Sequence, residues 1–202
     1  MINSDAQGLE VNSSGVIYYT STDFYQGEVN LIVFASDSKP AITNISVRAE
    51  YYSYYQPLTF KAKKDDTCVI QLNKVGSPSA INLQYKINNE PWTKYKIGDY
   101  IALRKNDVVS FSGNNDHFSH GVSYNGEFEV DYYQFAMSGQ FESYGNVMSL
   151  MNWGNSVDSF GFYGLFSGCT ELETAPLVPA TELSNHCYRA MFADCSDLRT
   201  AP

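Results

Sequence analysis

The sequence has little positive charge and no long apolar run. Its 13 Lys and Arg residues stand against 22 Asp and Glu residues, and the formal net charge is −9. Proteins that bind nucleic acid gain affinity from clustered basic side chains that displace the counterions of the phosphates. No such cluster is present, so nucleic acid is not an expected partner. Because no apolar run approaches the roughly 20 residues of a membrane helix, no membrane insertion is expected either.

Catalytic and cofactor-binding motifs are also missing. The sequence contains no Gly-x-Ser-x-Gly, no phosphate-binding Gly-x-x-x-x-Gly-Lys, no His-Glu-x-x-His and no dinucleotide fingerprint. The carboxylate pairs Glu127/Glu129 and Glu171/Glu173 have a spacing that a solvated strand face explains. The four cysteines are too few for a disulfide framework and lack the CxxC-like spacing of zinc sites. We therefore expect a protein that is not an enzyme and that holds no cofactor or metal.

The first residues lack the basic and apolar regions of a signal peptide. Two interpretations stay open: either an export signal was removed, or the protein never used one.

Aromatic residues are abundant, with 16 Tyr and 12 Phe, whereas only 17% of residues are charged. Such a composition favours strands, where aromatic side chains pack on the pleated surface. Alternating segments separated by turn residues predict strands at 58–63, 68–72, 81–87, 92–97, 100–103, 108–111 and 130–137. Three shorter strands are predicted at 16–19, 29–35 and 42–49. This spacing favours an antiparallel β-sandwich with one buried face on each strand.

Two segments are candidate partner-binding surfaces. Tyr51, Tyr52, Tyr54 and Tyr55 form an aromatic cluster that could stack on sugar rings or pack a partner, although the same residues could simply cover a sheet. The second segment, residues 113–126, is predicted to be a polar loop. Its candidate binding residues are Asn114, Asp116, His117 and His120. A metal or catalytic role for the two histidines lacks a third placed ligand, and a solvated loop explains them equally well.

Near the C-terminus a segment nearly repeats itself, with an offset of 26 positions. The matching residues are Phe166 and Phe192, Cys169 and Cys195, Leu172 and Leu198, and Pro176 and Pro202. Self-similarity at such a period is typical of solenoids, in which each short unit buries its apolar face only against a neighbour. The equivalent positions of Cys169 and Cys195 indicate small buried side chains in a ladder. A disulfide between Cys187 and Cys195 is the alternative.

Several motifs together resemble BspA-type leucine-rich-repeat surface proteins of gut Bacteroidetes, such as Bacteroides, and of their phages. They are Pro57-Leu58-Thr59-Phe60, Trp92-Thr93-x-Tyr95, Gly145-Asn146-Val147-Met148-Ser149-Leu150, and the repeat Cys187-Tyr188-x-x-Met191-Phe192-x-x-Cys195-x-x-Leu198-x-Thr200-Ala201-Pro202. The resemblance covers residues 57–202. It implies a β-sandwich followed by repeats, each an irregular helix (187–193 here) and a short strand (172–175 and 198–201). It supplies no catalytic residues, and residues 1–56 resemble nothing that we can place.

We therefore predict a mainly β protein in which an antiparallel β-sandwich precedes the start of a leucine-rich-repeat solenoid. The expected parts are an N-terminal arm or small β subdomain (1–56), the β-sandwich (57–145), and a connector with the first repeats (146–202). The favoured function is a non-enzymatic recognition or adhesion module, extracellular or at the cell surface, that binds glycan or protein. The alternative is a virion protein, such as a phage fibre or tail component, whose N-terminal arm anchors to other virion subunits. An oligomer is compatible with either function.

Overall fold

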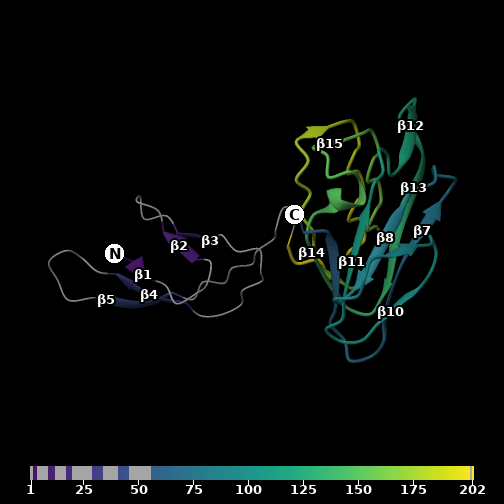
Figure 1. The fold of residues 1–202 in the computed structure, drawn as a ribbon. Coiled ribbons are helices and arrows are strands. Elements are labelled where there is room, and N and C mark those ends of the chain that lie inside the picture. Colours follow the sequence, from purple (N-terminus) through teal and green to yellow (C-terminus); the bar gives the residue numbers. More distant parts are fainter. Residues whose placement is uncertain are drawn as a thin grey trace. The chain divides into compact units, whose positions relative to one another are not determined.

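The computed structural model describes residues 56–200 and 202, apart from the side chain of Tyr124, and the backbone of five short strands within residues 1–55. The chain divides into two compact units, Met1–Tyr51 and Tyr52–Pro202. The fold is mainly β and contains several antiparallel sheets (Figure 1). The prediction of a β-rich protein is therefore confirmed.

The described part of the first unit consists of two small antiparallel sheets. One has the order β1-β4-β5 and the other pairs β2 with β3. The strands are β1 Ile2–Asn3, β2 Leu9–Val11, β3 Ile17–Tyr19, β4 Val29–Val33 and β5 Ala41–Ile45. The strands predicted at 16–19, 29–35 and 42–49 overlap β3, β4 and β5.

The second unit contains two larger sheets. A six-stranded sheet has the order β16-β14-β6-β11-β8-β9, and a four-stranded sheet has the order β10-β7-β13-β12. In the first, the strands are β6 Leu58–Ala62, β8 Leu83–Ile87, β9 Thr93–Tyr95, β11 Val108–Gly113, β14 Phe141–Tyr144 and β16 Leu172–Thr174. In the second, they are β7 Cys68–Val75, β10 Ile101–Leu103, β12 His120–Tyr124 and β13 Glu127–Ser138. All neighbours pair antiparallel except β14 and β16, which are parallel.

Aromatic side chains from both sheets meet in the core. Phe60 on β6 and Phe111 on β11 contact Phe135 on β13, with ring centroids 5.1 and 5.3 Å apart. All three side chains are almost completely buried. Burial of a phenylalanine contributes about 1.5–3 kcal/mol to stability, so this cluster is a main source of cohesion between the sheets. The alternation seen in the sequence produces it, because inward residues come from every second position of each strand.

The structure corrects the prediction that residues 113–126 form a loop throughout. His120–Tyr124 is strand β12, which pairs with Glu127–Asp131 of β13. The connection is Asn125-Gly126, both in the left-handed region with φ of 53° and 84°. An Asn-Gly pair of this kind makes a tight hairpin whose twist matches that of the strands. The polar composition reflects a strand exposed at the sheet edge, which the sequence pattern alone does not separate from a loop.

A buried serine ties the connector to the six-stranded sheet. The connector forms a 3₁₀ helix, η1 Val147–Leu150, which follows β14. Ser149 Oγ accepts a hydrogen bond from Leu58 N (2.8 Å) and donates one to the Phe111 carbonyl (3.0 Å). Because every partner in this buried set is satisfied, the helix is held at one position on β6 and β11. In the described residues, no helix has the length and apolar character needed to cross a membrane.

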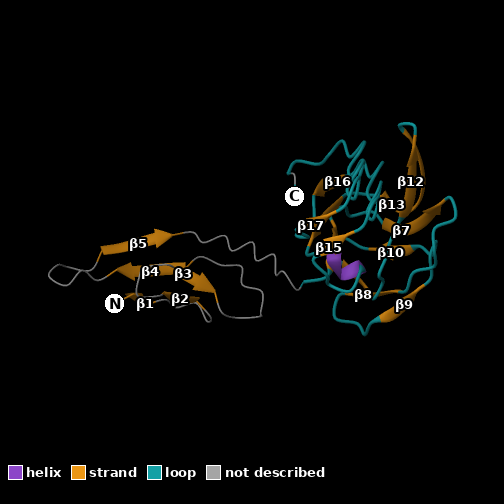
Figure 2. Cartoon of the chain, turned by 90° about the horizontal axis from the view of Figure 1, so that it is seen from above, coloured by secondary structure: helices purple, strands orange, loops and turns teal. Residues whose placement is uncertain are grey.

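After η1, the two copies of the repeat run side by side. The parallel strands β15 Ser156–Val157 and β17 Glu182–Leu183 pair with each other, so residues 26 positions apart are neighbours (Figure 2). A parallel bridge likewise joins Thr174 to Thr200. The first copy continues the six-stranded sheet through β16, so this segment and the two sheets share one hydrophobic core.

Residues 187–193 do not form the irregular helix that the resemblance implies. They lie in a run of consecutive turns, as do the matching residues of the first copy. Left-handed backbone angles recur every fourth residue at the same places in both copies: Phe160, Gly164 and Gly168, then His186, Ala190 and Asp194. A residue with positive φ interrupts the right-handed helix, so the backbone closes four-residue turns, in which an amide donates to the carbonyl three residues back.

One glycine shows how the first copy differs from the second. A Cβ atom at Gly164 would lie 2.8 Å from Cε2 of Tyr132, a residue of β13. The matching residue of the second copy, Ala190, is exposed and has room for its methyl group. The sequence therefore has glycine in the copy that packs on the sheet.

Backbone hydrogen bonds join the copies at regular intervals. Alternate amides of the first copy donate to carbonyl oxygens of the second over 2.8–3.2 Å, and the amides between them donate three residues back within their own copy. The donors are Phe160, Phe162, Gly164, Phe166 and Gly168, and the acceptors are Asn185, Cys187, Arg189, Met191 and Ala193. Among the described residues, the matching second-copy amides donate to no backbone carbonyl. Those amides belong to His186, Tyr188, Ala190, Phe192 and Asp194.

This asymmetry predicts a large difference in hydrogen exchange. The five first-copy donor amides are expected to exchange at least about ten-fold more slowly than the five matching second-copy amides, because exchange of the former requires the copies to separate. Residue-resolved exchange by NMR measures the difference. Equal protection of the two sets would show that the copies do not stack in solution.

Side chains stack along the same direction as the backbone bonds. Phe166 lies between Phe135 and Phe192, with centroid distances of 5.5 and 5.2 Å and interplanar angles of 7° and 14°. Each repeated thiol donates to a carbonyl oxygen, Cys169 to Phe135 (3.2 Å) and Cys195 to Phe166 (3.0 Å). Burial raises the pKa of the Cys169 thiol. All four cysteines are free, and the alternative of a Cys187–Cys195 disulfide is not realised.

Candidate binding site

The polar segment that follows β11 is anchored by a buried asparagine. Asn115 Nδ2 donates to the carbonyls of Leu150 (2.7 Å) and Asn82 (3.0 Å), and Asn115 Oδ1 accepts from Asn82 N (2.7 Å). The segment is thereby fixed between η1 and the residue that precedes β8. A buried amide with all these partners gives the segment a defined conformation. The neighbouring candidate residues are therefore presented from a fixed backbone.

The His117 imidazole contacts the Asp158 carboxylate in the first turn of the repeat. The distance from His117 Nδ1 to Asp158 Oδ2 is 2.6 Å, and both side chains are more than half exposed. The sequence places Asp116 beside His117, but the tertiary structure brings in Asp158 instead. An exposed pair of this kind contributes little to stability, about 0–1 kcal/mol. Its significance is that it positions an imidazole and a carboxylate at an accessible surface.

Two clefts flank this pair. The larger, here called the His117 cleft, has a volume of about 380 Å³. It is lined by Ser79, His117, Phe118, Ser119, His120, Gly121, Asp158, Ser159 and Ser184. Of these residues, Phe118 is held in place by packing against the rings of Tyr133 and Phe162. The smaller, the Asp116 cleft, has about 160 Å³ and is lined by Asn115, Asp116, Met148, Met151, Asn152, Gly154, Ser156 and Asp158.

A third cleft lies on the outer side of the six-stranded sheet and includes Asn114. This Lys94 cleft has a volume of about 410 Å³ and is lined by Asn82, Leu83, Gln84, Lys94, Ser112, Gly113 and Asn114. The segment from Asn114 to His120 thus borders all three clefts. Their walls carry amides, hydroxyls, two imidazoles, carboxylates and one ammonium group, which suit a hydroxyl-rich or charged ligand.

The chemistry available in the His117 cleft is hydrogen bonding and charge pairing. In the described part of the chain, no serine hydroxyl is hydrogen-bonded to His117, so the Asp158–His117 pair has no attached nucleophile. Ser119 Oγ accepts a hydrogen bond from Tyr133 N instead (3.4 Å). Within residues 56–200, no group of three His, Cys, Asp or Glu side chains is placed to hold a metal ion.

The carboxylates of Glu171 and Glu173 have structural partners. Glu171 accepts hydrogen bonds from Lys64 and from Gly139 N, and the pKa of its carboxyl is lowered, first by the Lys64 bond and then by the backbone bond. Glu173 pairs with Arg199 (3.4 Å) and accepts from Gln140. These contacts join the first copy of the repeat to the loop between β6 and β7, to the turn before β14, and to the second copy.

Four of the eight residues selected from the sequence lie at these clefts: Asn114, Asp116, His117 and His120. The cluster Tyr51, Tyr52, Tyr54 and Tyr55 lies outside the described residues. Sequence reasoning missed Asp158, Ser159 and Ser184, which reach the site only because the repeat packs beside β12. It also missed the polar residues Gln84, Lys94 and Ser112 on β8, β9 and β11. The alternation of the predicted strands could have indicated them, because a polar residue stands at every second position.

Comparisons with protein-family models, with curated proteins and with solved structures find no match to this chain.

Proposed function

We propose that the protein is a non-enzymatic recognition module displayed at a surface, and that it binds glycan or protein ligands through the clefts around Asn114–His120. The observation that carries the proposal is the conjunction of three open polar clefts on one anchored segment. Such clefts offer directed hydrogen bonds and charges but hold no assembled nucleophile or metal site in the described residues. Extracellular or cell-surface display follows from the resemblance to BspA-type proteins.

The architecture that we propose for residues 57–202 is a β-sandwich followed by the first coils of a BspA-type leucine-rich-repeat solenoid. Its support is the 26-residue offset, which recurs in the strand pairing, the left-handed residues and the aromatic stack. In a solenoid, each coil is stabilised mainly by its neighbours. The sandwich then acts as the cap of the first coil, because Phe135 N donates to the Leu165 carbonyl (2.8 Å).

Binding to a panel of immobilised glycans and extracellular proteins tests the functional proposal. We expect at least one ligand to bind the full chain, and the double variant Asn114→Ala/His117→Ala to reduce that affinity at least about ten-fold. Both side chains are exposed at the clefts and bury no core surface, so the fold should persist. The control is Glu182→Gln, an exposed carboxylate on β17 that lines none of the three clefts. Absence of binding, or equal loss in both variants, would contradict the proposal.

The second candidate is a virion structural protein. It is favoured by one observation: Met1–Tyr51 is a unit of its own, and its described strands pair only with one another. A separate unit of this kind is suited to anchoring on another subunit. Immunogold labelling of phage particles and of intact cells separates the two candidates, since label confined to particles supports the virion function.

A further inference from the structure

A row of polar side chains crosses the outer face of the six-stranded sheet. Ser112 on β11 is the register partner of Gln84 on β8, and Gln84 is the partner of Lys94 on β9. Because alternate residues of a strand point to opposite faces, these three share the face opposite to the buried Leu83, Tyr95 and Phe111. Asn82 and Asn114 complete the Lys94 cleft.

Within the described residues, these polar side chains have no hydrogen-bond or ion-pair partner in the protein. Within residues 56–200, the side chains of Asn82, Gln84, Lys94, Ser112 and Asn114 make no hydrogen bond or ion pair. Several other lysines are paired, for example Lys63 with Glu142 and Lys105 with Asp65. In the His117 cleft, by contrast, the His117 imidazole already has the Asp158 carboxylate as a partner. The Lys94 cleft therefore presents donors and acceptors that are free to receive a ligand.

An aromatic platform lies on the same face. Trp92 is 38% exposed, and the ammonium group of Lys86 lies 5.3 Å from the centre of its ring. Trp92 immediately precedes β9 and lies two residues before Lys94, a separation of about 7 Å in extended backbone. Lys86 follows Gln84 on β8 with the same spacing. A ring face, two ammonium groups and several amides thus fall within the reach of one or two sugar rings.

The charge of this face is opposite to that of the whole chain. The formal net charge is −9, yet the lining of the Lys94 cleft contains a lysine and no Asp or Glu. An anionic group is attracted there and repelled from most of the remaining surface. Two lysines are too few for a nucleic-acid backbone, whose binding relies on many phosphate contacts. The amides and hydroxyl instead match the hydroxyl groups of a carbohydrate.

We propose that the outer face of β8, β9 and β11 binds an acidic carbohydrate. Lys94 pairs with the anionic substituent, Gln84, Asn82, Asn114 and Ser112 bind hydroxyl groups, and Trp92 stacks on a ring. This proposal rests on the proposed recognition function and names its ligand class. The anionic substituent is a carboxylate, as in uronic acids, or a sulfate, since an ammonium group pairs with both.

Calorimetric titration of the full chain tests the assignment with matched ligands. The probes are oligogalacturonate, a sulfated dextran fragment, a neutral galactose oligosaccharide and polyglutamate. We expect the two acidic carbohydrates to bind at least about ten-fold more tightly than the neutral one, with an affinity that falls as salt is raised. The stronger of the two identifies the anionic substituent. Tighter binding of polyglutamate than of both acidic carbohydrates would overturn the assignment and indicate an acidic peptide.

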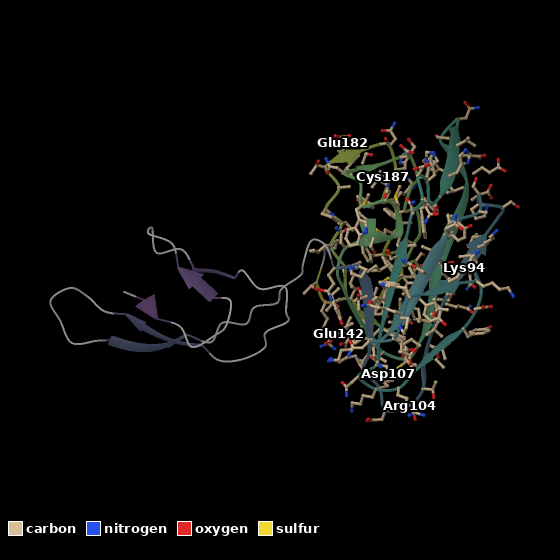
Figure 3. The ribbon with its side chains drawn as sticks, viewed as in Figure 1. Lys94, Arg104, Asp107, Glu142, Glu182 and Cys187 are labelled. Carbon is tan, nitrogen blue, oxygen red and sulfur yellow. The ribbon has the colours of Figure 1, made fainter. Side chains whose placement is uncertain are left out.

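Single substitutions locate the ligand. Lys94→Gln is expected to lower the affinity for the acidic carbohydrate at least about ten-fold, and Trp92→Ala by a similar factor. The matched control is Arg104→Gln, which removes the same charge at the lower end of the unit in Figure 3, away from Lys94 on its side. Unchanged thermal unfolding midpoints establish that each variant is folded. Equal affinities of Lys94→Gln and Arg104→Gln would overturn the proposed site.

The two proposals fail in different ways. A chain that binds neutral glycans or proteins, with an affinity unaffected by Lys94→Gln, overturns the acidic-carbohydrate site and leaves the recognition function standing. A chain that binds no member of either panel overturns both.

Discussion

Replacing Phe166 by alanine is expected to lower the free energy of unfolding of the Tyr52–Pro202 unit by about 3–5 kcal/mol. The side chain is fully buried, and it contacts aromatic rings from three separate segments: Phe60 on β6, Phe135 on β13 and Phe192 in the second copy. Truncation removes the buried ring and leaves a cavity that rigid strands on two sides cannot close. The loss therefore includes both the transfer free energy and the lost packing.

The matched comparison is Phe192→Ala, the same substitution 26 residues later. Phe192 is only partly buried, and among the described residues its ring contacts one aromatic ring, that of Phe166, so we expect about half the effect or less. Urea-induced unfolding followed by fluorescence and circular dichroism measures both. Similar losses for the two variants would contradict the view that the first copy is clamped between the sheets and the second copy.

Gly145→Ala is expected to lower the free energy of unfolding by about 2–5 kcal/mol. Gly145 has a φ of 78°, and a Cβ atom there would lie 2.1 Å from the Pro57 carbonyl oxygen and 2.9 Å from its carbon. Both are backbone atoms, so no side chain can rotate away. The chain at Gln56–Pro57 must shift, which disturbs the Asn146 N to Gln56 O hydrogen bond of 2.8 Å and the pairing of Pro57 with Asn146.

A second glycine separates backbone strain from the clash. Gly126 has a similar φ of 84°, but an added Cβ meets nothing within 4 Å. Gly126→Ala should therefore cost only the conformational penalty, about 1–2 kcal/mol. Denaturant titration of both variants gives the difference between them. If the two losses are the same, the close approach of Pro57 to Gly145 is not present in solution.

Local sequence pattern was sufficient to predict most strands of the two larger sheets. In Leu58–Ala62 and Cys68–Leu72, the apolar residues at every second position are buried, and of the residues between them Thr59 is buried as well. Turn residues such as Asn88 and Asn125-Gly126 adopt the positive φ angles that their short side chains tolerate. The alternation of polar and apolar residues did not predict β12. His120–Tyr124 lies at the sheet edge, where both faces can carry polar side chains and no two-residue pattern results.

At the candidate site, local sequence pattern identifies the polar segment but not the residues that pack against it. Composition identified the segment with Asn114, Asp116, His117 and His120, because turn and polar residues interrupt the strand pattern there. The partner of His117 is Asp158, which no spacing rule indicates, since the pair depends on how the repeat packs beside the sheet. The Lys94 cleft likewise requires three strands to be in register, and strand order is a property of the tertiary fold.

By itself the sequence determined the β-rich fold, the positions of most strands and the 26-residue repeat, because side-chain alternation and self-similarity are local and periodic. Only the tertiary structure decided that the repeat forms turns stacked on β13 rather than a helix, since that choice depends on backbone partners contributed by another copy and by the sheet. It also decided which polar groups remain unpaired at the clefts, because pairing between Lys63 and Glu142, or between His117 and Asp158, joins residues that are distant in sequence. The physical reason is common to both: hydrogen bonds and charges act over a few ångströms in space, whatever the separation along the chain.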